Sequence, residues 1–117
     1  MVKQMAFVAY SVKDVPRAAA FYRDIVGLRP GDSSFGDAWV EFDVGETTFG
    51  IGNGEAIGIA PGSQFSAAFE VDDVAAMRER LVALGVTVTE LAESPVCVSC
   101  FVTDPDGNRF ALHQRTA

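Results

Sequence analysis

The order of apolar and polar positions predicts a strand, a helix and a hairpin in the first half of the chain. Asp14 is placed to cap the helix, Pro16 is tolerated in its first turn, and Gly27 ends it. The hairpin strands alternate in polarity around a Gly45-Glu46 turn. The predicted elements are a strand over residues 5–12, a helix over 15–26, and hairpin strands over 38–44 and 47–51.

The same order of elements returns in the second half. Asp73 is placed to cap a helix with apolar residues at helical spacing, and Gly85 ends that helix. The run Asp104-Pro105-Asp106-Gly107 is typical of a turn, because proline and glycine restrict the backbone and aspartate bonds locally. The predicted elements are strands over 65–71, 86–91, 96–102 and 109–113, with a helix over 74–84.

Three landmarks repeat at a nearly constant distance along the chain. Residues 12–15 match 71–74 at an offset of 59, Gly27 matches Gly85 at 58, and residues 49–52 match 110–113 at 61. This regularity indicates an internal duplication, with each half ordered β-α-β-β-β. Module one then covers about residues 1–53, a glycine-rich linker about 54–64, and module two about 65–117.

Composition sharpens the expected class of protein. A chain of 117 residues with 49% hydrophobic and 21% charged residues predicts a single globular domain over residues 1–117. The net charge of -7 opposes a nucleic-acid partner and favours a cationic ligand. No apolar run suits a bilayer span, and the first residues lack the pattern of a signal peptide. With only two cysteines, we expect a cytoplasmic protein without membrane contact.

Three motifs resemble those of the vicinal oxygen chelate superfamily, which contains glyoxalase, bleomycin-resistance protein and ring-cleaving dioxygenases. They are residues 7–14, residues 21–28 and the run Asp104-Pro105-Asp106-Gly107-Asn108 before the last strand. The resemblance covers essentially the whole chain. It implies an α+β fold in which two βαβββ modules in tandem form a curved, partly open mixed sheet around a cavity. It also implies a homodimer, because the cavity of this superfamily commonly lies at a dimer interface.

The resemblance locates the positions where metal-dependent members place four ligands, usually His or Glu. In this chain these positions hold Phe7, Gly50, Ser66 and Ala111. A phenyl ring and two residues without polar side chains offer no lone pair, and one serine is a poor lone ligand. We therefore expect no metal ion and no cofactor, and we do not carry over the Lewis-acid chemistry of the metal-dependent members.

Strand alternation predicts the side chains on the cavity face, starting from Phe7. The predicted ligand-binding residues are Phe7, Trp39, Glu41, Ser66, Glu70, Arg109 and His113. Each also has a purely structural interpretation: the aromatic residues as packing, the carboxylates as a solvated strand face, and the single histidine as a polar strand end. Cys97 and Cys100 have Cys-x-x-Cys spacing but lie in a predicted strand, which favours buried thiols over a redox or zinc motif.

Two functions of different classes follow from this face. The first is a metal-free protein that sequesters a small drug or metabolite, with a cationic aromatic ligand held by Trp39, Phe7 and Phe35 beside acidic side chains. The second is a lyase, isomerase or dioxygenase that uses non-standard metal ligands such as His113, Glu41 and Glu70, or His113 as acid and base. A regulatory module with a vestigial cavity is a third alternative.

Overall fold

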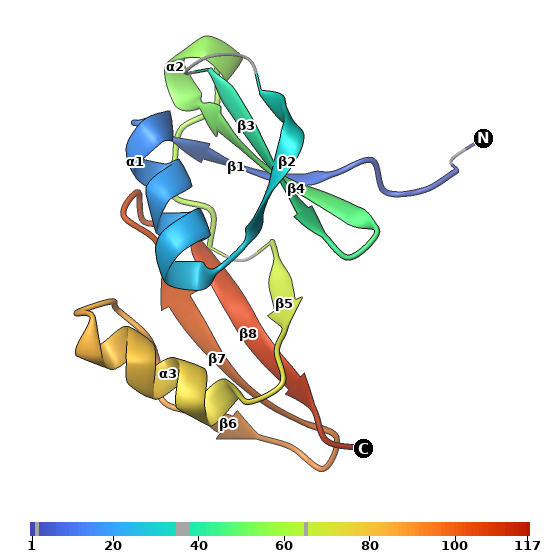
Figure 1. The fold of residues 1–117 in the computed structure, drawn as a ribbon, viewed down its shortest axis with the longest axis vertical. Helices are drawn as coiled ribbons and strands as arrows, with labels where there is room; N and C mark the ends of the chain where they lie inside the picture. The colour runs from blue at the N-terminus through green and yellow to red at the C-terminus, as the bar shows by residue number, and fades with distance from the viewer. Residues whose placement is uncertain (2, 35–37, 65) are drawn as a thin grey trace. The chain divides into compact units, whose positions relative to one another are not determined.

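Each half of the chain forms one four-stranded mixed sheet with a helix after its first strand (Figure 1). The structure, a computed structural model, describes residues 1, 3–34, 38–64 and 66–117. The chain divides into Met1–Ser63, called unit 1 below, and Gln64–Ala117, called unit 2. The two sheets with their helices confirm the expected α+β fold with tandem βαβββ modules.

Unit 1 contains the elements located from the sequence and, in addition, the strand Arg29–Ser34 and the short helix Gly54–Ile57. It contains β1 (Val8–Val12), α1 (Val15–Ala20), the π-helix η1 (Phe21–Val26), β2 (Arg29–Ser34), β3 (Trp39–Val44), β4 (Thr47–Asn53) and α2 (Gly54–Ile57). The strand order is β1-β4-β3-β2, with β1 parallel to β4 and the other pairs antiparallel. The short helix α2 lies in the stretch that we expected to be a linker.

The helix expected over residues 15–26 changes type at its midpoint. Its beginning is as predicted, since the Asp14 side chain accepts a hydrogen bond from the Arg17 backbone N–H at 3.1 Å. Its second half is a π-helix, in which the Gly27 N–H donates to the Tyr22 carbonyl at 3.0 Å. Gly27 ends it with φ of 90°. Apolar periodicity predicts a helix here but does not distinguish the wider π turn from an α turn.

Strand β2 was not predicted, because its sequence Arg-Pro-Gly-Asp-Ser-Ser is rich in turn-favouring residues. Pairing with β3 provides its strand geometry: Arg29 lies opposite Asp43 and Pro30 opposite Phe42, with an irregularity in register between Pro30 and Ser34. The strand lies at the edge of the sheet, where a proline removes no bond from a second neighbour.

An aromatic cluster forms the core of unit 1. The Tyr22 ring lies 5.0 Å from Phe49 and 6.4 Å from Phe42, and the Tyr10 ring lies 5.4 Å from Phe49, as centroid distances. All four side chains are buried. Because neighbouring strand residues point to opposite faces, this packing commits the alternate positions of β1, β3 and β4 to the other face of the sheet.

Unit 2 repeats this architecture. It contains β5 (Ala68–Glu70), α3 (Val74–Ala83), β6 (Ala92–Glu93), β7 (Cys97–Thr103) and β8 (Arg109–Arg115). Its strand order, β5-β8-β7-β6, corresponds position by position to that of unit 1. The partners Ala9 and Gly50 correspond, at the offsets of 59 and 61, to the partners Ala68 and Ala111. The repeat found along the chain is therefore also a repeat of strand register.

The strand expected over residues 86–91 is wrong. The structure has an isolated bridge between Val88 and Val102, and β6 begins only at Ala92. The segment still runs alongside β7, since the Thr89 N–H donates to the Phe101 carbonyl at 2.9 Å. In the other direction the Phe101 N–H donates to the Thr89 side-chain Oγ1, also at 2.9 Å. A side chain thus takes the place of a backbone carbonyl, which interrupts the ladder.

The predicted turn before the last strand is confirmed and is tightly bonded. The Asp104 carboxylate accepts the backbone N–H groups of Asp106 and Asn108, each at 2.8 Å, and the Asn108 side-chain amide at 3.0 Å. Asp104 and Asn108 are buried, and Gly107 has φ of 82°. This turn determines where β8 begins.

The helices are short, the longest being the ten residues of α3. Within the described ranges, none of them has the length and apolar character needed to cross a bilayer.

Candidate functional site

The indole of Trp39 lies across two glycines of the neighbouring strand in unit 1. A Cβ atom added to Gly50 would lie 2.5 Å from Trp39 Cζ2, and one added to Gly52 would lie 2.9 Å from Trp39 Cε3. Both distances are below any normal contact between carbon atoms. The glycines therefore provide the space in which the indole rests on the backbone of β4.

Two further predicted residues contact this indole. The Phe7 ring meets it edge to face, with 5.3 Å between ring centroids and 76° between planes. The indole Nε1–H donates to Glu41 Oε2 at 2.8 Å. Phe7 remains 49% exposed, and Trp39 and Glu41 are half-buried. We call this group, Phe7, Trp39, Glu41, Gly50 and Gly52, the Trp39 platform: an accessible aromatic surface with a carboxylate at its edge.

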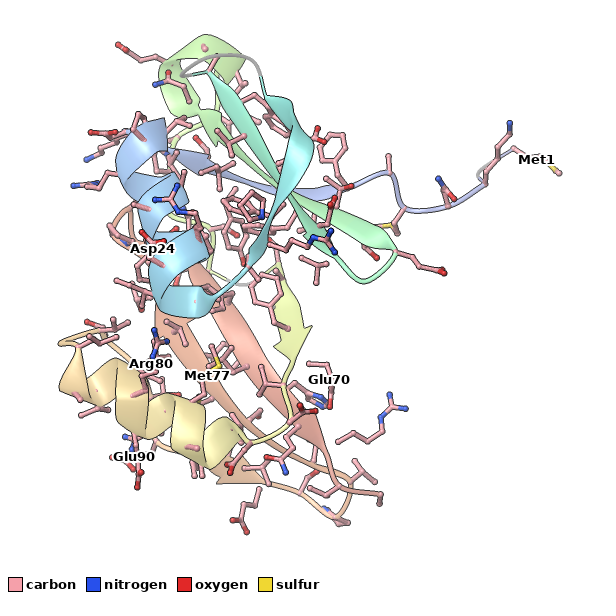
Figure 2. All side chains as sticks on the ribbon, viewed as in Figure 1. Met1, Asp24, Glu70, Met77, Arg80 and Glu90 are labelled. Atoms are coloured by element: carbon pink, nitrogen blue, oxygen red, sulfur yellow. The ribbon has the colours of Figure 1, made fainter. Side chains whose placement is uncertain are left out.

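A second pair of predicted residues meets in unit 2. The His113 Nδ1 lies 2.6 Å from Glu70 Oε1, and Glu70 Oε2 accepts the Arg115 backbone N–H at 2.6 Å. The bond from the Arg115 backbone and the bond from His113 hold the pKa of the Glu70 carboxyl below its usual value. Glu70 lies on β5 (Figure 2) directly opposite His113 on the parallel strand β8.

Arg109 lies on the same side of β8 as His113, four residues earlier. Its guanidinium carbon is 4.9 Å from the ring centroid of Phe101, a cation–π distance. Phe101 was not among the predicted site residues. Strand pairing in the structure reveals its place: Phe101 lies opposite Ala111, which puts it on the Arg109 and His113 face of the β7–β8 hairpin.

A sequence model of the Glyoxalase/Bleomycin resistance protein/Dioxygenase superfamily matches residues 4–112 of this chain. The chain belongs to this superfamily. The match covers nearly the whole chain and confirms the resemblance inferred from the three motifs. A comparison with curated protein sequences finds no match.

Solved structures of the superfamily have a similar fold. The chain is 25% identical to TnmS3, an antibiotic binding protein from Streptomyces sp. CB03234, over 98% of both chains and with a TM-score of 0.83. It is 23% identical to lactoylglutathione lyase from Agrobacterium tumefaciens, covering 97% of this chain and 94% of that one, with a TM-score of 0.81. For the fosfomycin resistance protein FosX from Listeria monocytogenes, the identity is 22%, the coverage 99% and 96%, and the TM-score 0.75. The last two similarities show a shared fold alone.

The residues at the superfamily's metal-ligand positions do not fit a divalent ion. Phe7 borders the Trp39 platform, and the side-chain space of Gly50 is filled by the indole. Ala111 lies opposite Ala68, and Ser66 is exposed two residues before β5. The set contains one hydroxyl oxygen, whereas Zn²⁺ and similar ions need three or four nitrogen, oxygen or sulfur donors. Nowhere in the described part of the chain do three or more His, Cys, Asp or Glu side chains gather as metal donors.

The predicted site residues thus form two groups, one in each unit. Phe7, Trp39 and Glu41 meet in unit 1, and Glu70 and His113 meet in unit 2 with Arg109 on the same strand face. Ser66 lies at the start of unit 2, and Phe35 lies outside the described residues.

Unit 1 also contains a cleft that the sequence did not predict. It has a volume of about 480 Å³ and is lined by residues at the ends of β1 and β4 and along α2 and the loop after it: Val12, Lys13, Asn53, Gly54, Glu55, Gly58, Ile59, Ala60 and Pro61. The Ser11 hydroxyl donates to the Ile59 carbonyl and ties this loop to β1. None of the predicted site residues lines the cleft.

The two cysteines lie in β7, as predicted, and both are free thiols. Cys100 belongs to the core of unit 2, and burial raises the pKa of its thiol. Cys97 is half-buried, with its Sγ atom 3.3 Å from the Ser94 hydroxyl. Since residues three apart in a strand point to opposite faces, the two thiols do not form a pair.

Proposed function

We propose that this superfamily member binds a small drug or metabolite on the Trp39 platform without using a metal ion. The observation that carries the proposal is the indole of Trp39 over Gly50. It replaces a position of metal coordination with an aromatic surface. Flat aromatic ligands gain from stacking on such a surface, about 0.5–1.5 kcal/mol beyond the area buried.

The platform favours a ligand that is cationic as well as aromatic. Glu41 is bonded to the indole N–H, so its carboxylate is held at the edge of the ring. A cation over the ring face would interact both with the indole and with this carboxylate. The net charge of -7 attracts the same class of ligand. The similarity to TnmS3, an antibiotic binding protein, is in accord with sequestration of a drug-like molecule.

We further propose that the protein acts as a homodimer in the cytoplasm. Large apolar side chains are exposed in both units, including Phe7 and Ile59 in unit 1 and Leu84 and Val96 in unit 2. Covering such side chains is a common reason for association.

The test is a calorimetric titration of the purified protein with bleomycin and with the cationic dye acriflavine. We expect at least one of them to bind, and Trp39→Ala to weaken that binding about tenfold, since losing about 1.4 kcal/mol of stacking and cation–π energy changes the affinity tenfold. Because Trp39 is the only tryptophan, intrinsic fluorescence of the unmodified protein reports directly on the platform.

Three variants control this experiment. Glu41→Gln removes the platform charge and is expected to weaken binding severalfold, whereas Glu46→Gln makes the same charge change in the exposed β3–β4 turn and is expected to leave binding unchanged. Gly50→Ala displaces the indole and is expected to shift the Trp39 emission. Equal affinities of the unmodified protein and Trp39→Ala contradict the proposal. So does a stoichiometric metal ion that raises the melting temperature.

The second candidate is a lyase or dioxygenase of the superfamily with His113 as acid and base. The Glu70–His113 distance of 2.6 Å favours it, because a carboxylate that orients an imidazole is a common arrangement in proton transfer. Assays with hemithioacetal and catechol substrates distinguish the two. Turnover that His113→Gln abolishes and Trp39→Ala preserves would support the enzyme.

A further inference from the structure

We infer that Glu70 and His113 form a ligand subsite of unit 2 that binds compounds through an acidic hydroxyl group, as phenols have. Its two residues belong to unit 2 and share no residue with the Trp39 platform of unit 1. Neither residue stands at a metal-ligand position of the superfamily, which in this unit are Ser66 and Ala111.

Glu70 determines which nitrogen of His113 faces a ligand. One carboxylate oxygen lies 2.6 Å from His113 Nδ1, and the other accepts the Arg115 backbone N–H. The carboxylate is thereby held in place by two hydrogen bonds and kept ionised, so it accepts a hydrogen bond from the Nδ1–H group. The proton of neutral His113 then resides on Nδ1, and the lone pair is on Nε2.

The backbone holds this pair rigidly. Glu70 and His113 are directly opposite each other in the β5–β8 ladder, and the Val71 N–H donates to the His113 carbonyl at 2.8 Å. Both side chains belong to the sheet face opposite the buried core residues Phe69 and Leu112. A pair built on two bonded strands keeps its geometry more closely than one placed on a loop.

The surroundings leave the pair accessible. The side-chain exposure is 33% for His113 and 57% for Glu70. The preceding residues on the same face are Ala68 and Ala111, which are partners in the ladder and whose methyl groups fill little space. Among the described residues, His113 Nε2 has no hydrogen-bond partner. Ala111 is buried and Ala68 is exposed, so the oriented acceptor is presented beside the methyl group of Ala68.

The chemistry of the pair selects the ligand. Nε2 with a lone pair accepts a hydrogen bond, so the group opposite it must be a donor. A phenol is a strong donor, and its flat ring would fit against the exposed methyl group of Ala68. Further along the same face, about 13 Å from His113 at the usual strand rise, the Arg109 guanidinium over Phe101 is placed to receive an electron-rich end of a longer ligand.

The experiment uses the full chain with ¹⁵N-labelled histidine, because His113 is the only histidine and its two nitrogens give unambiguous resonances. For the neutral imidazole of the free protein, we expect the proton on Nδ1 and the lone pair on Nε2. 4-Nitrophenol is then titrated, with 4-nitroanisole as the matched probe that replaces the hydroxyl hydrogen with a methyl group. We expect a saturable shift of the Nε2 resonance with 4-nitrophenol only.

Variants test the two residues separately. His113→Gln removes the oriented acceptor and is expected to weaken 4-nitrophenol binding about threefold to tenfold, the usual effect of losing one hydrogen bond. Glu70→Gln removes the carboxylate that keeps the His113 proton on Nδ1, and it is also expected to weaken 4-nitrophenol binding. Glu93→Gln makes the same charge change on the exposed strand β6 and should leave binding unchanged.

Three results overturn the inference: the Nε2–H tautomer in the neutral imidazole of the free protein, equal responses to the two probes, or unaltered affinity of Glu70→Gln. The first measurement needs neither a ligand nor a variant, so it decides even if a variant fails to fold. If the Glu70–His113 inference fails, the proposal for the Trp39 platform still stands, because ligand binding there is measured by Trp39 fluorescence and by the affinity of Trp39→Ala. Conversely, if no ligand binds to the Trp39 platform, the expected resonances of His113 stay the same.

Discussion

At the scale of single residues, the positions that matter most depend on one another. Gly50 and Gly52 are useful only because Trp39 is present, since the indole occupies the space that their side chains would fill. Likewise, His113 has a defined tautomer only because Glu70 is bonded to it. Alternation along the strands placed Phe7, Trp39 and Glu41 on one face, which could be predicted. The contact between indole and glycine could not, because it depends on a side-chain torsion.

The Glu70 carboxylate predicts a pH dependence of stability. Its pKa in the folded protein lies below the usual 4.5, because the Arg115 N–H and His113 bond to the charged form. Such a group stabilises the fold above its unfolded pKa, and the contribution is lost as the pH falls through the folded pKa. The stability difference between the unmodified protein and Glu70→Gln should therefore be present at about pH 7 and shrink below about pH 4.5.

Urea unfolding midpoints over this pH range measure the effect. Glu79→Gln, an equal charge change on the exposed side of α3, serves as the control. A difference between Glu70→Gln and the unmodified protein that stays constant down to about pH 3 would count against the bonded carboxylate.

At the scale of elements, the sequence predicts a helix start or a turn correctly where the hydrogen bond of a single side chain stabilises it. Asp14, Asp73 and the Asp104 turn act as their sequence context predicts. The elements that were not predicted correctly are those whose structure depends on pairing with another strand. Strand β2 exists because β3 supplies its partners, and residues 86–91 fail to form a regular strand because Thr89 uses its side chain in the ladder. Neither effect is visible in the periodicity of the segment itself.

The cap of α3 offers a direct measurement. The Asp73 carboxylate accepts the Ala76 N–H at 3.0 Å, and the Val74 N–H donates to the Gln114 side chain of β8 at 2.9 Å. Asp73→Ala leaves the first turn without its side-chain acceptor and should cost about 1 kcal/mol of unfolding free energy. Asp73→Ser should recover most of it.

Chemical denaturation of the purified variants measures this change in unfolding free energy. Asp72→Ala, one residue earlier and exposed, is the matched control and should change the stability by less than about 0.5 kcal/mol. If both alanine variants lose the same stability, the cap does not act as the geometry indicates.

At the scale of the whole molecule, the repeat of topology and register in units 1 and 2 is the dominant feature. The chain belongs to a superfamily whose members differ in what their shared fold does. The duplicated framework places equivalent faces in both units, but the side chains on them differ. Unit 1 presents an aromatic surface and unit 2 an imidazole with a carboxylate.

The oligomeric state is the prediction at this scale. Exposed apolar side chains in both units, among them Ile59, Val82 and Val96, should become covered when two chains associate, because removing them from water is favourable. Light scattering at micromolar concentration is expected to give a mass of about 25 kDa, twice the 12.5 kDa of one chain. A mass of 12.5 kDa would refute the dimer.

The order of most elements, the duplication, the superfamily and the lack of suitable donors at the metal-ligand positions can all be inferred from the amino-acid sequence. Those properties follow from local patterns, caps and side-chain chemistry that are present in the chain before it folds. The packing of Trp39 over Gly50 and Gly52, and the hydrogen bond between Glu70 and His113, are known only from the folded chain. Each contact joins two different strands, β3 with β4 or β5 with β8, and it forms only when strand pairing brings the side chains together.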